Sequence, residues 1–224
     1  MKYIALNNIC KSYKQAQDAI VVLNDISFTF DFKKTYAITG ASGSGKSTLI
    51  HILAGITKPN SGRVDWCNEL NIDQIDDQQK GLLWNKKLSF IFQQANLINE
   101  LTVLENVALK GLIANQSNAY AEAFNWLETL GLEHRVNFMP NVLSRGEKQR
   151  VAIARSLMCR PDLILADEPT ASLDQANGQH VINLLITLTK EHKIGLIVST
   201  HDNYVYCKMD QILTMANGKL VSTN

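Results

Sequence analysis

Hydrophobic and polar positions change their spacing along the chain, and the first third has the pattern of strands. Short runs rich in β-branched and aromatic residues recur there, and such runs are favoured in sheets. A helix-like run at residues 47–53 interrupts them. We expect strands at residues 3–9, 21–30, 35–39, 62–66 and 88–92, with a turn or bulge at Asn24-Asp25.

The middle of the chain has helical spacing. Thr102 and Glu105 are placed to form a capping box, in which both side chains satisfy free N–H groups at a helix start. A third helix is expected to begin at Ser144, and Gly131 is placed to close a second. The apolar stripe of that second helix is predicted at Tyr120, Phe124 and Leu127. Residues 95–160 are therefore expected to form a helical insert within an α/β fold.

The last third returns to alternating strands and helices. Residues 163–166 are continuously apolar, as a strand covered on both faces should be. Asp174 is placed to cap a helix at residues 175–190, and residues 195–199 form another buried strand. A hairpin turn at Asn217-Gly218 is expected to join two final strands, at residues 211–215 and 219–221.

Composition bounds the class of protein. Of 224 residues, 46% are hydrophobic and 19% charged, which is a globular profile. The net charge of +1 gives no electrostatic reason to expect a nucleic-acid partner. No apolar stretch approaches the ~20 residues of a membrane span, and the first residues turn polar too soon for a signal peptide, so we expect a protein of the cytosol. Buried reduced thiols are expected at the four scattered cysteines, Cys10, Cys67, Cys159 and Cys207.

One short segment, residues 40–48, predicts nucleotide binding. It matches the phosphate-binding pattern G-x-x-x-x-G-K-[ST] and stands between a strand-like and a helix-like run. Its glycines allow a tight turn whose N–H groups, with the positive end of the following helix, form a nest for phosphate oxygens. Lys46 would reach the terminal phosphates and Ser47 would bind Mg²⁺. A chance match to the bare pattern is expected in about 1% of chains of this length. The segment comprises Gly40, Ala41, Ser42, Gly43, Ser44, Gly45, Lys46, Ser47 and Thr48.

Acidic and imidazole side chains follow two of the predicted buried strands. Asp167 and Glu168 come directly after residues 163–166, and His201 follows residues 195–199. Ligands of open parallel sheets bind beyond the carboxyl ends of the strands. Asp167 is therefore a candidate to hold Mg²⁺ through water, Glu168 to polarise an attacking water, and His201 to touch the γ-phosphate. The alternative, an acidic pair that merely caps a helix, is less compelling beside a phosphate loop.

These motifs and their order along the chain resemble those of the nucleotide-binding subunits of ATP-binding-cassette (ABC) transporters. The resemblance extends from about Tyr3 to Leu220. Phe92-Gln93 is similar to the family's Q-loop, and Thr200-His201-Asp202 to its switch histidine. The run from Leu163 to Asp174 is similar to its Walker B strand and D-loop. Its signature sequence, usually Leu-Ser-Gly-Gly-Gln, is represented by Leu143, Ser144, Arg145, Gly146 and Glu147.

The resemblance implies an α/β P-loop NTPase of the ABC ATPase type. It implies an N-terminal antiparallel β subdomain and an inserted α-helical subdomain, within a single domain over residues 1–224. Residues 1–94 and 161–224 would form the RecA-like core and the β subdomain. Residues 95–160 would form the helical subdomain with the signature. It also implies hydrolysis of ATP with Mg²⁺, and a head-to-tail dimer of two copies with each ATP between the phosphate loop of one and the signature of the other.

Family roles carry over residue by residue. Glu168, His201, Gln93 and Lys46 would be catalytic, and Ser47, Gln93 and Asp167 would hold the metal, Asp167 through water. Asp174 would act across the dimer. Tyr13 corresponds to the aromatic residue that stacks on adenine, although packing on protein is an equal alternative. Arg145 and Glu147 depart from the usual glycine and glutamine, whereas Ser144 and Gly146 keep the phosphate-contacting pair, so we expect ATP sandwiching with altered affinity or rate.

Chain length and two further sequence runs indicate a particular branch of the ABC ATPase subunits. Residues 166–174 and 101–107 resemble the ATPase subunits for lipoprotein release, macrolide export and FtsE-type cell division. The resemblance implies an integral membrane partner and a location on the cytoplasmic face of the inner membrane. Leu97, Ile98 and Leu101 would line the groove for the partner's coupling helix, or belong to ordinary core. A soluble cassette switch acting on a non-membrane partner is the main alternative function, and a nucleotide kinase is a remoter one.

Overall fold

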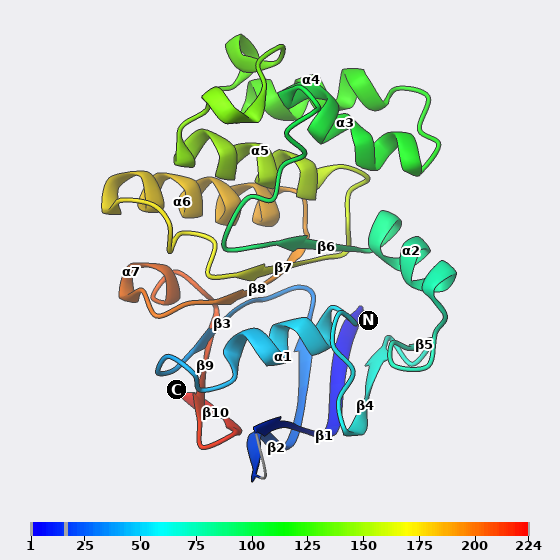
Figure 1. Cartoon of the computed structure of the whole chain (residues 1–224), viewed down its shortest axis with the longest axis vertical. Coiled ribbons are helices and arrows are strands. Elements are labelled where there is room, and N and C mark those ends of the chain that lie inside the picture. Colours follow the sequence, from blue (N-terminus) through cyan, green and yellow to red (C-terminus); the bar gives the residue numbers. More distant parts are fainter. Residues whose placement is uncertain (1, 16–17, 224) are drawn as a thin grey trace. The chain divides into compact units, whose positions relative to one another are not determined.

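The computed structural model describes residues 2–15 and 18–223, and it divides into two compact units. The first unit comprises residues 1–81 and 195–224, and the second comprises residues 82–194. Figure 1 traces both from the amino to the carboxyl end. None of the helices in the described ranges is long and apolar enough to cross a membrane.

An antiparallel sheet opens the first unit. Its strand order is β2-β1-β4-β5, and all of its pairings are antiparallel. The bulge predicted at Asn24-Asp25 is confirmed, because the register passes from Ile9↔Ile26 to Lys11↔Leu23 and Asp25 takes a φ of 54°. The strands are β1 (Tyr3–Gln15), β2 (Asp18–Asp31), β4 (Ser61–Trp66) and β5 (Leu70–Asn71).

Strands of the first unit also form a second, mainly parallel group in the order β10-β9-β3-β8. Strand β3 (Thr35–Thr39) pairs in parallel with β8 (Gly195–Ser199) and β9 (Gln211–Ala216). The predicted hairpin to β10 (Lys219–Thr223) is confirmed, since Asn217 and Gly218 both have the positive φ of a tight hairpin turn. Helices α1 (Lys46–Leu53) and α7 (Asn203–Tyr206) belong to the same unit (Figure 1).

The second unit joins one parallel strand pair to a layer of helices. Strands β6 (Leu88–Ile91) and β7 (Leu163–Asp167) pair in parallel, and β7 is buried along its whole length. The capping box at Thr102 and the cap at Asp174 are both present. Its helices are α3 (Val103–Ile113), α4 (Ala119–Thr129), α5 (Arg145–Leu157) and α6 (Gln175–Glu191). Helices α3 and α4 pack side by side and are drawn in green in Figure 1. Short 3-10 turns occupy Glu133–Arg135 and Pro140–Val142.

Helix α2 (Asp77–Lys86) is a helix that the sequence pattern did not predict. Only Leu83 is buried along it, so it lacks the apolar stripe on which such predictions depend. A side-chain cap begins it instead, because the Asp76 carboxylate accepts a hydrogen bond of 2.7 Å from the Gln79 N–H.

The apolar stripe predicted for helix α4 is wrong. Tyr120 and Phe124 are 48% and 40% exposed, and only Leu127 is buried. The packed face is formed instead by the small side chains of Ala119 and Ala123, together with Trp126. They let α4 approach α3 so closely that a Cβ on Gly111 would lie 2.9 Å from the Ala119 Cβ.

Burial of the cysteines was also predicted wrongly. All four are free thiols, as expected, but three are only half-buried and Cys207 is exposed. The incomplete burial is explained by polar neighbours. The thiols of Cys10, Cys67 and Cys159 each contact main-chain or side-chain amide groups rather than apolar side chains alone. Cysteine is small enough to serve at such mixed positions.

Candidate active site

The phosphate-binding loop has a backbone that only glycine adopts easily. Gly40, Gly43 and Gly45 have φ values of 143°, 77° and 100°. A Cβ on Gly40 would meet the Met215 carbonyl oxygen at 2.6 Å, and one on Gly45 would meet Val22 Cγ1 at 2.9 Å. At Gly43 a Cβ would meet no atom within 4 Å, so conformation alone requires glycine there. The loop then leads into helix α1, with Gly45 as its N-cap.

Lys46 is buried beneath this loop. Its Nζ donates hydrogen bonds to the carbonyl oxygens of Gly40 (3.0 Å) and Ala41 (3.1 Å). The Ser44 hydroxyl is also buried and, among the described residues, has no hydrogen-bond partner. Buried polar atoms are rarely left unsatisfied, so an ammonium group and an orphaned hydroxyl in a glycine loop fit a ligand rich in acceptor oxygens. Ser47 and Ala41 to Gly43 are exposed, and Thr48 is half-buried.

Strand register brings His201 level with the start of the loop. Ile38 of β3 pairs with Ser199 of β8 in parallel, so Gly40 and His201 each lie two residues beyond paired positions. The turn after β8 is fixed by Thr200, whose N–H donates to the Ile38 carbonyl oxygen at 3.0 Å. His201 itself is exposed. The prediction that it emerges at the same sheet edge as the phosphate loop is therefore confirmed.

Tyr13 lies in the same unit, near the end of β1. Its ring is 46% exposed, and the Lys11 Nζ stands 5.2 Å from the ring centre. The ring is therefore partly covered by protein and partly open to solvent, and stacking on adenine stays a prediction.

Gln93 and Glu168 form an equivalent pair in the second unit. Ile91 of β6 pairs in parallel with Ala166 of β7, so Gln93 and Glu168 each lie two residues beyond a paired position, just past the carboxyl ends of these strands. Asp167 is the last residue of β7 and is buried, whereas Gln93 is exposed and Glu168 half-buried. The prediction that Asp167 and Glu168 stand at the carboxyl end of this strand is confirmed, and Gln93, which the resemblance supplied, follows the neighbouring strand.

Glu168 has an unusual backbone. Its φ is 44°, in the left-handed region that non-glycine residues seldom occupy. A hydrogen bond of 3.1 Å from the Ala171 N–H to the Glu168 carbonyl oxygen turns the chain sharply after it. Backbone strain of this kind is concentrated at functional sites.

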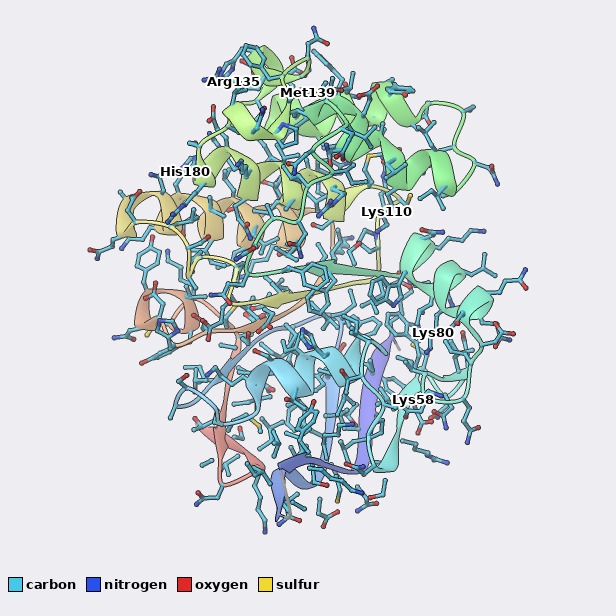
Figure 2. All side chains as sticks on the ribbon, in the orientation of Figure 1. Lys58, Lys80, Lys110, Arg135, Met139 and His180 are labelled. Carbon is cyan, nitrogen blue, oxygen red and sulfur yellow. The ribbon has the colours of Figure 1, made fainter. Side chains whose placement is uncertain are left out.

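Helix α5 begins at Ser144 with the predicted capping box. The Ser144 hydroxyl accepts from the Glu147 N–H (3.2 Å), and the Glu147 carboxylate accepts from the Ser144 N–H (2.8 Å). Arg135, which Figure 2 labels, adds an ion pair at 2.9 Å to that carboxylate. Burial raises the pKa of Glu147, but these hydrogen bonds and the guanidinium outweigh it and hold the pKa below its usual value. Ser144 and Arg145 are exposed, and Gly146 is half-buried.

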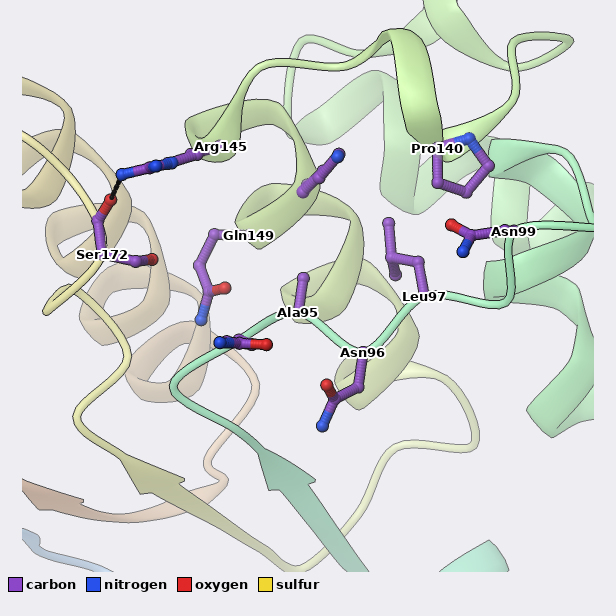
Figure 3. Close-up of a pocket in the computed structure, with 10 residues that line it drawn as sticks. Ala95, Asn96, Leu97, Asn99, Pro140, Arg145, Gln149 and Ser172 are labelled. Carbon is purple, nitrogen blue, oxygen red and sulfur yellow. Dashed lines mark hydrogen bonds between the residues drawn. The ribbon is translucent and has the colours of Figure 1, made fainter.

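Arg145 reaches from the start of α5 to the segment before Asp174. Its Nη1 donates to the Ser172 carbonyl oxygen at 3.5 Å, which Figure 3 shows as a dashed line. A cavity of about 500 Å³ opens beside it, between α5 and residues 94–99. Leu97 lines this cavity, and Gln149 Nε2 donates to the Phe92 carbonyl oxygen at 3.2 Å, so α5 holds the segment around Gln93.

The Asp174 side chain caps the start of helix α6. Its carboxylate accepts from the Asn177 N–H (3.0 Å) and from the Asn177 side-chain amide (2.6 Å). These bonds lower the pKa of the Asp174 carboxyl. A Cβ on Gly146 would lie 3.5 Å from the Asn177 amide oxygen, so the signature glycine and the α6 cap are close neighbours.

Three of these supporting residues were missed from the sequence. Arg135, Gln149 and Asn177 act through contacts between elements, which no spacing rule reveals. Asn106 lies in the run 101–107, but no role was predicted for it. Buried at 1% exposure, it binds the main chain at Ile98, Leu101 and Thr102.

Comparison with known proteins decides the family. A family model described as ABC transporter matches residues 23–171. The chain belongs to the ABC transporter family. Its sequence is 37% identical to the lipoprotein-releasing system ATP-binding protein LolD of Wigglesworthia glossinidia brevipalpis, over 100% of this chain and 98% of that protein.

Solved ABC ATPase structures agree with this assignment. A dimeric, post-hydrolysis structure of the ATP-binding cassette MJ0796 bound to ADP and Pi matches with a TM-score of 0.89 and 35% identity, over 97% of this chain and 96% of that one. The cassette cbiO1 from Clostridium perfringens, part of the ABC transporter complex cbiONQ, matches with a TM-score of 0.84 and 28% identity, over 99% and 88%. The chain has the ABC ATPase fold, as the resemblance implied, and is the ATP-binding, ATP-hydrolysing subunit of an ABC transporter.

Proposed function

We propose that two copies of this chain close head-to-tail on ATP and thereby drive an integral membrane subunit. The likeness to a dimeric cassette bound to ADP and Pi, over nearly the whole chain, carries this proposal. The exposed start of helix α5 supports it, because a helix N-terminus with a capping serine is suited to an anion. Within the 1–224 ATPase domain, residues 1–94 and 161–224 form the core and β subdomain, and residues 95–160 the helical subdomain.

ATP hydrolysis proceeds by in-line attack of water on the γ-phosphate. The loop N–H groups and the Lys46 ammonium stabilise the charge that develops on the phosphate oxygens. Glu168 accepts a proton from the water, and His201 and Gln93 hold the water and phosphate in line. Ser144 and Gly146 of the second copy complete the site, and Asp174 acts at the dimer interface. Tyr13, with its exposed ring, stacks on the adenine.

The oxygen donors of the site fit Mg²⁺. Ser47 offers an exposed hydroxyl in the first turn of α1, Asp167 a carboxylate at the end of β7, and Gln93 an amide oxygen. Hydroxyl, carboxylate and amide oxygens are the ligands that this hard cation prefers, usually together with water and phosphate oxygens. Ser47 and Gln93 would bind the ion directly, and Asp167 would hold it through water. The bound ion would supply positive charge to offset that of the phosphates.

The membrane partner belongs to the class served by lipoprotein-release, macrolide-export and FtsE-type ATPases. The 37% identity to LolD supports this branch. The chain then sits on the cytoplasmic face of the inner membrane. Residues 97–101 are half-buried to exposed, with Ile98 40% exposed, so part of this segment is free to line the groove for the partner's coupling helix.

Glu168→Gln tests the ATPase mechanism. The variant keeps the side-chain shape but loses the base, so we expect it to bind ATP, to dimerise stably and to turn over negligibly. Sedimentation velocity with ATP measures the dimer, and phosphate release measures turnover. Glu191→Gln, at the exposed end of α6, is the matched control and should behave as the unmodified chain. An ATP-loaded Glu168→Gln protein that stays monomeric at high concentration would contradict the dimer, and unchanged turnover would remove Glu168 from its role.

The membrane partner is tested separately. The tagged chain is purified from detergent-solubilised membranes, and co-purifying proteins are identified by mass spectrometry. We expect one integral membrane protein in stoichiometric amount, and addition of it to the purified chain should change the ATPase rate. Recovery of only soluble or ribosomal proteins would overturn the assignment to transport.

A further inference from the structure

Lys11 lies over one face of the Tyr13 ring. Its Nζ stands 5.2 Å from the ring centre, and the two side chains leave β1 on the same side of the sheet, because they are two residues apart. A cation in this position is attracted by the negative charge on the face of the ring. Lys11 is half-buried, whereas Tyr13 is 46% exposed. One face of the ring is thus covered by the lysine, and the exposed part of the ring remains available to a ligand.

The loop that follows helix α1 fixes the Lys11 ammonium group. The Lys11 Nζ donates a hydrogen bond of 2.7 Å to the carbonyl oxygen of Lys58, which Figure 2 labels. The same loop also holds the main chain on either side of this lysine. The Asn60 N–H donates to the Cys10 carbonyl oxygen at 2.8 Å, and Asn60 Oδ1 accepts from the Ser12 N–H at 2.7 Å. A lysine side chain has many rotamers when it is not held, so these bonds determine where its charge stands.

No carboxylate forms an ion pair with Lys11 among the residues that the structure describes, because the ion pairs found there join other side chains. The Lys58 carbonyl oxygen that holds the ammonium group is a neutral acceptor. An ion pair would offset most of the field of the ammonium group at the ring. The positive charge of Lys11 therefore acts on the Tyr13 ring without a carboxylate in contact to cancel it.

The strand that pairs with Tyr13 lies against the phosphate-binding loop. Ile20 of β2 is the register partner of Tyr13, and Val22 stands two residues further along the same strand. A Cβ on Gly45 would meet Val22 Cγ1 at 2.9 Å and the Val22 carbonyl oxygen at 3.0 Å, so the loop and β2 are in close contact. Gly45 is also the N-cap of α1, the helix that leads to Lys58. The Tyr13 ring, the phosphate loop and the loop that holds Lys11 are therefore packed together.

We propose that Lys11 is a positioning residue for the nucleotide: held by the Lys58 carbonyl oxygen, it covers one face of the Tyr13 ring and leaves the other face to the adenine. The inference rests on the proposed function, because it adds to the stacking of adenine on Tyr13. Two aromatic faces both carry negative charge and repel each other in a face-to-face stack. A cation on the far face draws that charge away and so strengthens the stack. Lys11 thus contributes to binding of the base and not of the phosphates.

Binding of ADP and of inorganic tripolyphosphate, each with Mg²⁺, separates the base from the phosphates. Isothermal titration calorimetry measures both affinities on the full chain. We expect Lys11→Met to weaken ADP about threefold and to leave tripolyphosphate unchanged. Lys11→Arg keeps a cation that also lies well over aromatic faces, so it should retain most of the ADP affinity. Lys14→Met, at an exposed lysine of the same strand, is the matched control and should bind both ligands as the unmodified chain does. An equal loss of both ligands in Lys11→Met would overturn the inference, because the charge would then act on the phosphates or on the fold.

A double-mutant cycle with Tyr13→Ala shows whether Lys11 acts through the ring. We expect Tyr13→Ala alone to weaken ADP about fivefold, and the further change Lys11→Met to add no loss. An added threefold loss in the double variant would overturn the inference, since Lys11 would then act without the ring. Tighter ADP binding by Lys11→Met would also overturn it, because the lysine would then occupy the face that the adenine uses. Unchanged ADP binding by Lys11→Met, beside a weakened Tyr13→Ala, would overturn the inference and leave adenine stacking standing, whereas unchanged binding by Tyr13→Ala would overturn both.

Discussion

Asn106 and Ile98 form a reciprocal pair of hydrogen bonds. The Ile98 N–H donates to Asn106 Oδ1 at 2.8 Å, and Asn106 Nδ2 donates back to the Ile98 carbonyl oxygen at 2.9 Å. The same amide nitrogen lies 2.9 and 3.0 Å from the carbonyl oxygens of Leu101 and Thr102. One buried side chain thus replaces the regular hydrogen bonds that residues 98–102 lack, which explains an asparagine in the apolar face of α3.

Asn106→Asp should therefore be strongly destabilising. It keeps the shape but replaces the donor with a carboxylate oxygen that faces three carbonyl oxygens, so we expect a loss of about 3 kcal/mol in the free energy of unfolding. Denaturant unfolding at pH 7 measures it. Asn99→Asp, an exposed change in the same segment, is the control and should change stability by less than about 0.5 kcal/mol. Equal effects of the two changes would show that residues 98–102 are held by something other than Asn106.

Local signals in the sequence were sufficient for most of the fold. Cap residues such as Ser144 and Asp174, and the turn at Asn217-Gly218, act within a few residues, so their chemistry is visible in the printed order. The edge position of His201 also followed, because it depends only on where a parallel strand ends.

Packing between elements could not be predicted in the same way. Tyr120 was expected in the core because of its helical spacing with Phe124 and Leu127, but the close approach of α3 and α4 at Gly111 favours Ala119 on the packed face. The half-burial of Lys110 beside Arg155 likewise arises from tertiary contact, and a lysine in a helix is expected at the surface. The ion pair that supports the signature at Glu147 depends on Arg135, which lies outside the motif.

The glycines of the phosphate loop should differ in their tolerance of alanine. Gly45→Ala adds both a strained positive φ and a contact with Val22, so we expect a loss of more than about 3 kcal/mol in stability. Gly43→Ala meets only the conformational cost of about 1–2 kcal/mol. Thermal unfolding and denaturant unfolding of both variants give the comparison. A Gly43→Ala protein as unstable as Gly45→Ala would show that steric contact is not the larger effect.

Glu147 should make stability depend on pH. Its folded pKa lies below the unfolded value of about 4.3, so the unfolded chain binds more protons in that range and stability falls as pH falls through the folded pKa. Arg135→Met removes the ion pair, and we expect a loss of about 1 kcal/mol at pH 7 that shrinks once the carboxyl is protonated. Denaturant unfolding at pH 7 and near pH 3 measures the difference. A loss of the same size at both pH values would indicate that Arg135 acts through packing of its alkyl chain.

Lys110 should also make stability rise with pH, but in the alkaline range. Its folded pKa of about 8 lies below the usual 10.5, so between these values the unfolded chain binds the extra proton and stability rises with pH. Lys110→Met should be more stable than the unmodified chain at pH 7, by about 2–3 kcal/mol, and this advantage should shrink by pH 10. Matched unfolding curves across that range test it, and a constant difference would mean that the ammonium is not the source.

Arg145→Gly tests the main departure from the family signature. Arg145 stands at the exposed start of α5, where in the proposed dimer it adds positive charge near the triphosphate bound by the other copy. In the Glu168→Gln background we expect Arg145→Gly to weaken ATP-dependent dimerisation about fivefold, or about 1 kcal/mol, and the difference should narrow at high salt because the charge is exposed. Arg145→Lys retains the charge and should retain most of the affinity, although it loses the reach to the Ser172 carbonyl oxygen. If Arg145→Lys and Arg145→Gly behave alike and the salt dependence is unchanged, the contact with Ser172, and not charge, is the contribution of Arg145. If Arg145→Gly changes neither dimerisation in this background nor the ATPase rate of the chain that keeps Glu168, the departure from the family signature is neutral.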